Sequence, residues 1–301
     1  MTENEFLLQD RLAKIYSTIC KFGEQNFRIS FSGGKDSTVL SALIDMAVPG
    51  NKIPRTYADT GIELNMIRDF VMERAKHDPR IVIIQPHQPI KKMLETYGYP
   101  FKSKRHAKLV AIYQKYRTTD GRPGIQHYLH INDDGVNWKP QNSCPKKLMY
   151  QFTDECTVKI SDMCCKMLKE KTLEEWAKDH KRPYAIIGVM RSEGGRRENA
   201  NCMAFTNGKL TAFQPLVHIT KDWENWLIEK FNISICDIYK PPYNFARTGC
   251  KGCPFAVGLQ HELDMLEKYF PAERKQCEMI WKPVYDEYRR IGYRLRKEVE
   301  Q

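Results

Sequence analysis

Alternating β-type and α-type segments, with a glycine-containing loop between the first pair, constrain the fold of this chain most strongly. A short β-type run at 27–31 leads into the loop Ser-Gly-Gly-Lys-Asp-Ser at 32–37, and residues 37–46 return to the apolar spacing of a helix. The same order follows at 54–58, 59–61 and 62–75, and a further strand is expected at 81–85. Such alternation predicts an α/β fold, a parallel sheet with helices on both faces.

The remaining segments extend this pattern. We expect helices at 4–22, 173–180 and 220–231, a core strand at 184–189, a loop at 118–142 and mostly helix after 254. The sequence therefore predicts a leading helix over 1–24 and a main α/β domain over 25–245, which carries a basic helical insertion at about 90–145. A Cys-x-x-Cys segment with a helical extension would occupy 246–301.

The charge balance favours a polyanionic partner. The chain has 48 basic and 37 acidic side chains, a net charge of +11. Nine basic residues but only two acids, Glu95 and Asp120, lie between Lys91 and Arg122. Nucleic acid or a nucleotide suits such a surface, although excess charge also serves solubility. The acidic, polar N-terminus and the lack of a long apolar run predict neither a secretory signal nor a membrane span, so a cytoplasmic location is expected.

The loop at 32–37 has the chemistry of an anion site. A strand that delivers glycines into a helix start presents unpaired N–H groups and the positive end of the helix dipole. Lys35 would add a fixed positive charge, the hydroxyls of Ser32 and Ser37 would add donors, and Asp36 would help to place Mg²⁺ or hold the loop. The spacing differs from that of a Walker A motif. The alternative is a tight turn in which Lys35 is solvated and Ser37 caps the helix.

Residues 31–37 resemble the signature of the PP-loop, or N-type, ATP pyrophosphatase superfamily. Segments 57–61 (Tyr-Ala-Asp-Thr-Gly) and 188–197 resemble its phosphoadenosine phosphosulfate (PAPS) reductase-like branch, and the resemblance spans about 28–255. It implies an adenine nucleotide alpha-hydrolase-like, Rossmann-like fold and ATP cleavage between the α- and β-phosphates. Lys35 and Asp36 would be catalytic, and the implied ATP-binding residues are Ser30, Ser32, Gly33, Gly34, Lys35, Asp36, Ser37, Asp59, Thr60, Gly61, Gly188, Arg191, Arg196 and Arg197. A plain Asp-Thr-Gly turn and a solvated arginine loop are the alternatives for 59–61 and 191–197.

Four of the ten cysteines form a pattern. Cys164 and Cys165 are adjacent, and Cys250 and Cys253 form a Cys-x-x-Cys pair, so four thiolates are available for Zn²⁺ or an iron–sulfur cluster. Adjacent cysteines are awkward ligands for one tetrahedral ion. The arrangement resembles that of assimilatory adenylyl-sulfate reductases, which implies a 4Fe-4S cluster, with Zn²⁺ as the second choice. The other six cysteines are expected to pack as small apolar residues, and among them Cys156 and Cys202 are the candidates for a sulfur carrier.

The departures from the reductases favour ATP cleavage. Sulfonucleotide reductases use a cysteine near the C-terminus, whereas no cysteine follows Cys277, and the phosphate loop is intact. The resemblance thus implies adenylylation of an acceptor, for sulfur transfer to DNA or tRNA as in DNA phosphorothioation or tRNA thiolation. A sulfur-donor protein such as a cysteine desulfurase would be a partner, and a homodimer is possible. The open alternatives are an iron–sulfur sulfonucleotide reductase and a non-catalytic nucleotide- or cluster-binding sensor.

Overall fold

A computed structural model describes residues 1–130, 143–194 and 197–297. The chain forms two compact units, each built from two separate segments. Unit 1 comprises Met1–His87 and Lys169–Thr248, and unit 2 comprises Gln88–Leu168 and Gly249–Gln301. The domain boundaries expected from the sequence remain predictions.

Unit 1 contains one six-stranded sheet in the order β3-β2-β1-β4-β6-β5. All neighbouring strands are parallel except β5 and β6, which pair antiparallel. The strands are β1 (Phe27–Ser30), β2 (Arg55–Ala58), β3 (Ile81–Ile84), β4 (Tyr184–Ile186), β5 (Met203–Thr206) and β6 (Lys209–Phe213). The predicted α/β class with a mostly parallel sheet is therefore confirmed.

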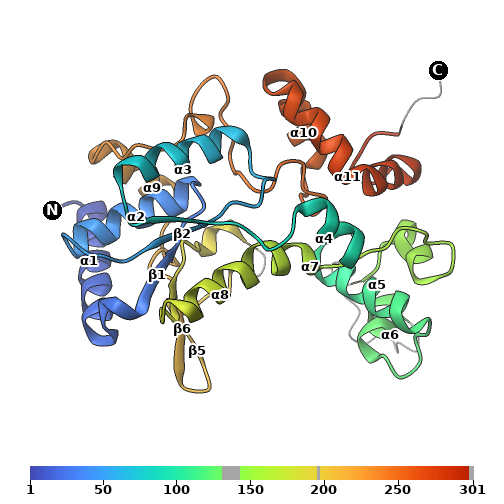
Figure 1. The fold of residues 1–301 in the computed structure, drawn as a ribbon, viewed down its shortest axis with the longest axis horizontal. Helices are drawn as coiled ribbons and strands as arrows, with labels where there is room; N and C mark the ends of the chain where they lie inside the picture. The colour runs from blue at the N-terminus through green and yellow to red at the C-terminus, as the bar shows by residue number, and fades with distance from the viewer. Residues whose placement is uncertain (131–142, 195–196, 298–301) are drawn as a thin grey trace. The chain divides into compact units, whose positions relative to one another are not determined.

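Helices cover both faces of this sheet (Figure 1). The helices α2 (Lys35–Ala47) and α3 (Asn65–His77) lie on one face, and α8 (Lys171–Asp179) lies on the other. Helices α1 (Glu3–Phe22) and α9 (Lys221–Lys230) pack with α2. Apolar side chains of α1, β1, α2, β4, β6 and α9 form the main core, in which Ile29, Leu43 and Phe213 are fully buried. Burial of this stripe fixes α2 against the sheet, and its first turn follows the carboxyl end of β1.

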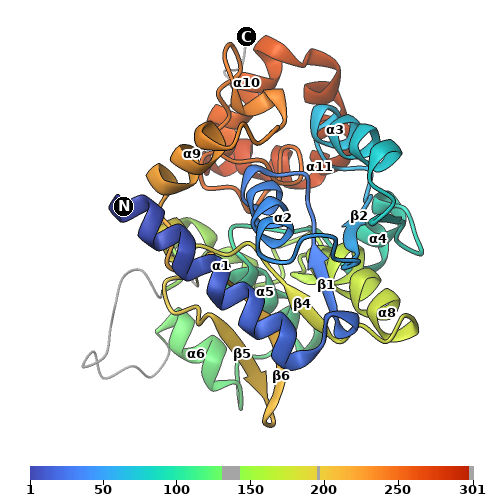
Figure 2. The same ribbon diagram turned by 90° about the vertical axis from the view of Figure 1, so that its left-hand side faces the viewer.

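The hairpin of β5 and β6 is a correction to the sequence analysis, which predicted no strand there (Figure 2). Asn207 and Gly208 join the strands with φ values of 50° and 74°. Positive φ at both central residues is the geometry of a type I′ turn, for which Asn-Gly is the preferred pair. The dipeptide was thus a visible signal for the hairpin.

Unit 2 is mainly helical in the part of the chain that is described. Its helices are α4 (Ile90–Tyr97), α5 (Lys104–Tyr116), α6 (Pro123–Leu129), α7 (Met163–Cys165), α10 (Leu259–Tyr269) and α11 (Pro271–Ile291). A 3₁₀ segment covers Lys146–Phe152, and the chain forms a π-helical turn at Lys166–Glu170 between α7 and α8. The helical C-terminal extension is confirmed.

Two predicted boundaries differ from the structure. The loop expected at 118–142 contains α6, which begins with Pro123 at the first helical position, where the missing N–H of proline costs no hydrogen bond. Residues 131–142 of that loop lie outside the described residues. The strand expected at 184–189 ends at Ile186. The Ile187 N–H still donates to the Phe213 carbonyl of β6 at 2.9 Å, and residues 187–189 line a cavity.

Aromatic contacts join the two segments of unit 2. The rings of Phe101 and Tyr288 are 4.4 Å apart, and the Tyr288 hydroxyl accepts a hydrogen bond of 2.7 Å from the backbone N–H of Lys102. Next to them, buried His106 bonds to the Tyr128 hydroxyl at 3.0 Å and to Gln151 Oε1 at 2.6 Å. Burial lowers the pKa of His106 to about 4, so the ring is neutral. The first segment is thus held by a helix near the end of the chain.

Candidate active site

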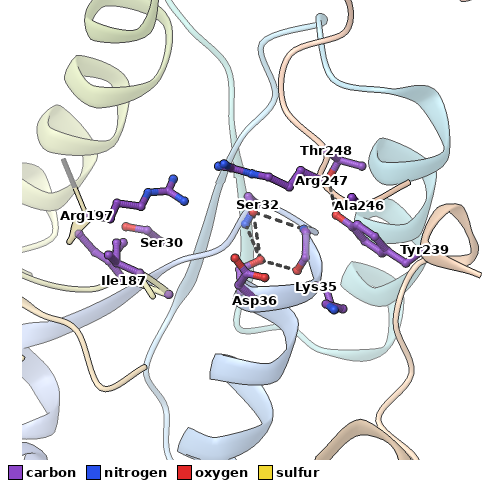
Figure 3. A pocket seen from close by; sticks show the side chains of 14 residues that line it. Ser30, Ser32, Lys35, Asp36, Ile187, Arg197, Tyr239, Ala246, Arg247 and Thr248 are labelled. Carbon is purple, nitrogen blue, oxygen red and sulfur yellow. Dashed lines mark hydrogen bonds between the residues drawn. The ribbon is translucent and has the colours of Figure 1, made fainter. Parts of the chain in front are cut away.

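The loop between β1 and α2 is closed by its own serines. Ser37 Oγ donates to the Gly34 carbonyl at 2.9 Å and accepts from the Ser32 N–H at 3.2 Å. The two serine hydroxyls are 3.1 Å apart, and Ser32 Oγ accepts from the Gly34 N–H at 3.3 Å (Figure 3). These bonds satisfy polar groups at the helix start, which has no side-chain cap at Gly34. Both hydroxyls therefore shape the loop in this structure.

Two glycines lie at close approaches of the backbone to neighbouring atoms. Gly33 has a φ of 70°, and a Cβ there would lie 2.5 Å from Val71 Cγ2 of α3. Gly188, just after β4, would bring a Cβ to 3.2 Å from the Asp36 carbonyl oxygen. The first contact seats the loop on α3 and the second brings the end of β4 against the first turn of α2.

A cavity of about 280 Å³ opens beside this loop. It lies at the carboxyl ends of β1 and β4, where the strand order reverses direction, which is where open α/β sheets bind ligands. Figure 3 shows Arg197 on one side of the loop, with Arg247, Thr248 and Tyr239 on the other. The lining residues are Ser30, Ser32, Gly34, Lys35, Asp36, Ser37, Ile187, Gly188, Val189, Arg197, Tyr239, Ala246, Arg247 and Thr248.

Eight of the residues expected to bind ATP line this cavity, and others lie elsewhere. Gly33 packs behind the loop, and Arg191 donates from Nε to the Ala200 carbonyl at 2.8 Å. Arg196 lies outside the described residues. Tyr239, Arg247 and Thr248 were not predicted. Arg247 and Thr248 directly precede Gly249 and the Cys-x-x-Cys pair, and that position was the signal for them.

The Asp-Thr-Gly segment follows β2, but its side chains are engaged with α3 and the turn before it. Asp59 pairs with Arg68, whose NH2 lies 3.0 Å from Oδ2, and the Thr60 hydroxyl donates to Glu63 at 2.7 Å. A smaller cavity of about 100 Å³ lies beside β2. It shares Ser30 and Ser32 with the larger cavity, and its other lining residues are Phe31, Tyr57, Ala58, Glu63, Lys169 and Leu173. The predicted nucleotide contacts of 59–61 remain predictions.

Lys35 has a buried counter-ion that the sequence analysis missed. Its Nζ lies 3.1 Å from Glu224 Oε2 and 3.1 Å from Asn225 Oδ1, both on α9. The Glu224 side chain is 0% exposed. Burial and the neighbouring Asp36 raise the pKa of Glu224 to about 7, while Lys35 acts in the opposite direction. A single acid between two tryptophans gives no sequence pattern that would reveal this role.

The Cys-x-x-Cys loop is held by helices of unit 2. Trp281 Nε1 donates to the Lys251 carbonyl at 3.0 Å, Glu262 accepts from the Gly252 N–H at 2.9 Å, and the Tyr288 hydroxyl donates to the Pro254 carbonyl at 2.9 Å. Gly252 has a φ of 58°, as a tight turn requires. These bonds fix the backbone between Cys250 and Cys253.

The four predicted cluster cysteines fit iron–sulfur chemistry by donor type, and all lie in unit 2. Burial raises the pKa of Cys253, and the thiols of Cys250 and Cys165 raise it further. Cys164 is buried on α7. Among the described residues, however, no three or more histidine, cysteine or acidic side chains are arranged as metal ligands.

The remaining cysteines show no sign of activation. All ten are free thiols. Burial raises the pKa of Cys202, and it raises the pKa of Cys156 to about 11. Both candidate sulfur carriers therefore have a lowered thiolate fraction. The described residues contain no helix that is long and apolar enough to cross a membrane.

Comparison with known families identifies the class of this chain. The model of the phosphoadenosine phosphosulfate reductase domain matches residues 26–126 and 112–256. The chain belongs to this family. An uncharacterized protein of Methanocaldococcus jannaschii is 24% identical over 282 residues, which are 92% of this chain and 53% of that protein. The chain thus spans about half the length of this curated relative.

Several solved structures are similar at low sequence identity. The phosphate complex of PAPS reductase from Candida auris is 9% identical, with a TM-score of 0.40 over 76% of this chain and 90% of that chain. The FMN adenylyltransferase of Candida glabrata with FAD and pyrophosphate is 14% identical, with a TM-score of 0.47 over 83% and 65%. The U34-tRNA thiolase of Methanococcus maripaludis with its 4Fe-4S cluster is 15% identical, with a TM-score of 0.38 over 94% and 80%. Because these scores are low, the strand order and the family model alone assign the fold and family.

A glycine pair tests whether the loop depends on the contact with α3. Gly33 and Gly50 both have a positive φ, but only at Gly33 would a Cβ meet other atoms. An alanine at either position costs about 1–2 kcal/mol for its left-handed backbone. We expect Gly33→Ala to lower the melting temperature by more than Gly50→Ala does, because its added methyl group would also meet Val71 of α3. Equal effects of the two substitutions would contradict this interpretation of the loop.

Proposed function

We propose that this chain is an ATP pyrophosphatase that adenylylates an acceptor. The observation that carries the proposal is the cavity beside the Ser-Gly-Gly-Lys-Asp-Ser loop, lined by three cations, Lys35, Arg197 and Arg247, and one acid, Asp36. Such a balance suits the phosphate chain of ATP. The smaller cavity beside β2 would take the base, since it shares Ser30 and Ser32 with the larger one. Arg191, Arg196 and residues 59–61 remain candidates for further nucleotide contacts.

In the proposed reaction an acceptor oxygen attacks the α-phosphorus of ATP. A bond forms between that oxygen and the phosphorus, the bridge from the α- to the β-phosphate breaks, and pyrophosphate leaves. Lys35 and the arginines stabilise the charge of the departing pyrophosphate, and catalysis comes from placement and charge. The carboxylate of Asp36 suits Mg²⁺, which would neutralise phosphate charge when bound.

We propose nucleic acid, DNA or tRNA, as the acceptor and sulfur transfer as the purpose. The adenylylated acceptor is open to displacement by sulfur from a donor protein such as a cysteine desulfurase, with AMP as the leaving group. The basic insertion supports this choice, since Lys91, Lys92, Lys108 and Lys115 are exposed on α4 and α5.

Pyrophosphate release tests the reaction. With Mg²⁺ and ATP we expect release that increases with DNA or tRNA, and we expect Lys35→Ala to lower it about 100-fold or more, as loss of one transition-state contact does. Lys76→Ala is the matched control, because Lys76 is 66% exposed on α3. Release stimulated only by sulfate would replace the nucleic-acid acceptor with a small one, and ATP binding without release would favour a sensor.

Salt dependence tests the nucleic-acid surface. We expect binding of a labelled duplex or tRNA to weaken steeply with salt. Replacing Lys91, Lys92, Lys108 and Lys115 together by alanine should reduce the log–log slope by at most about 3–4, at roughly 0.7–0.9 per lost phosphate contact. The control replaces Lys14, Lys52, Lys76 and Lys178, four exposed lysines of unit 1. Identical slopes for the two quadruple variants would exclude the insertion as the surface.

We further propose that Cys164, Cys165, Cys250 and Cys253 hold a 4Fe-4S cluster, with Zn²⁺ as the second choice. Protein purified without oxygen should contain iron and acid-labile sulfide, and Cys253→Ser should lose most of both. Cys236→Ser is the control, since Cys236 is a buried thiol of unit 1. Stoichiometric zinc without sulfide would select the second choice. Protein that contains neither iron nor zinc would refute the site.

The family model favours one second candidate, reduction of adenylyl sulfate or PAPS, because its description is that of a reductase domain. Thiol-dependent release of sulfite from either nucleotide, with no pyrophosphate release from ATP, would establish that alternative.

A further inference from the structure

A carboxylate and an amide from α9 reach the lysine of the phosphate loop. Glu224 Oε2 and Asn225 Oδ1 each lie 3.1 Å from Lys35 Nζ. The Lys35 ammonium donates a hydrogen bond to Asn225 and forms an ion pair with Glu224, whose buried carboxylate oxygens have no hydrogen-bond partner among the described residues. The Lys35 side chain is 15% exposed, and the Glu224 side chain is fully covered.

The position of α9 is fixed independently of the loop. Its N-cap Thr220 accepts a hydrogen bond from the Trp223 N–H at 3.3 Å, and Trp223 Nε1 donates to the Asn4 carbonyl of α1 at 3.1 Å. Trp223 and Leu227 are buried in the main core of unit 1. The Glu224 carboxylate therefore has a set location before any ligand arrives.

A buried ion pair contributes little to the stability of a fold, because the cost of desolvating both charges offsets their attraction. A fixed partner does restrict a long, flexible side chain, which otherwise loses conformational freedom on binding. The broader guanidinium of an arginine has a different donor geometry and would not reproduce these two contacts of the compact ammonium. The pair is thus suited to restricting where the Lys35 ammonium lies.

We propose that Glu224 and Asn225 are positioning residues of Lys35, which hold its ammonium where the phosphates of the nucleotide are bound. This inference rests on the proposed function, because it assigns Lys35 to the phosphates of ATP. Loss of the carboxylate leaves Lys35 more mobile and more free to attract ground-state phosphate. The reaction then slows, while ATP binding is retained or strengthened.

The first test compares Glu224→Gln with Glu229→Gln, an exposed acid on the same helix. We expect Glu224→Gln to lower kcat for pyrophosphate release about tenfold without raising KM for ATP, and to bind α,β-methylene ATP at least as tightly as the wild type. Glu229→Gln should change neither constant. In a Lys35→Ala background, Glu224→Gln should have no further effect on kcat. Unchanged kcat and KM, or a loss that only follows the unfolded fraction, would overturn the proposal.

The second test does not depend on turnover. The rate at which an N-hydroxysuccinimide ester acetylates Lys35, read by peptide mass spectrometry against Lys230, should rise several-fold in Glu224→Gln. If the glutamine variant does not fold, Asn225→Ala serves instead, because Asn225 is an exposed residue. A wild type without pyrophosphate release refutes the proposed function, and the labelling rate and the analogue affinity then decide the inference. An unchanged labelling rate overturns it in either case.

Discussion

The Ser37 hydroxyl closes the loop between β1 and α2, and the geometry of the whole site depends on that closure. It joins the Ser32 N–H to the Gly34 carbonyl, so the strand end and the helix start form one turn. The turn can be this tight because Gly33 packs against α3 and Gly188 lies against the Asp36 carbonyl. The ends of β1 and β4 therefore define the cavity walls at the point where the sheet order reverses.

Around this turn the charges are arranged unevenly. Lys35, Arg197 and Arg247 line the cavity, while the acid that balances Lys35 is buried outside the lining, on α9. A lining with three cations and one acid attracts anions, while the buried Glu224 compensates the charge of Lys35. The contact with Glu224 also restricts the Lys35 side chain, whereas a solvated lysine on a loop would have no such restriction.

Sequence patterns predicted those elements of the fold that are specified by residues close together in the sequence. Periodicity located β1, α2, β2 and β3, and the glycine-rich loop between strand and helix was sufficient to place the cavity. The hairpin at 203–213 was missed although Asn207-Gly208 marks it, because its strands are short and lack clear alternation. Glu224, Tyr239 and Arg247 were missed for a different reason. Their proximity to the loop is a product of tertiary packing over about 190–210 residues of sequence, which no local window contains.

The discontinuous make-up of unit 2 has a consequence for the order in which the chain folds during synthesis. Lys102 bonds to Tyr288, 186 residues later in the sequence, and Phe101 packs on the same ring. At a synthesis rate of roughly 5–20 residues per second, the first segment of unit 2 waits about 10–40 s for α11. During that interval its apolar residues lack their final partner, while β1, β2 and β3 have already left the ribosome. Unit 2 is therefore completed last. Factors that bind exposed apolar helices of nascent chains have the longest time to bind its first segment, residues 88–168.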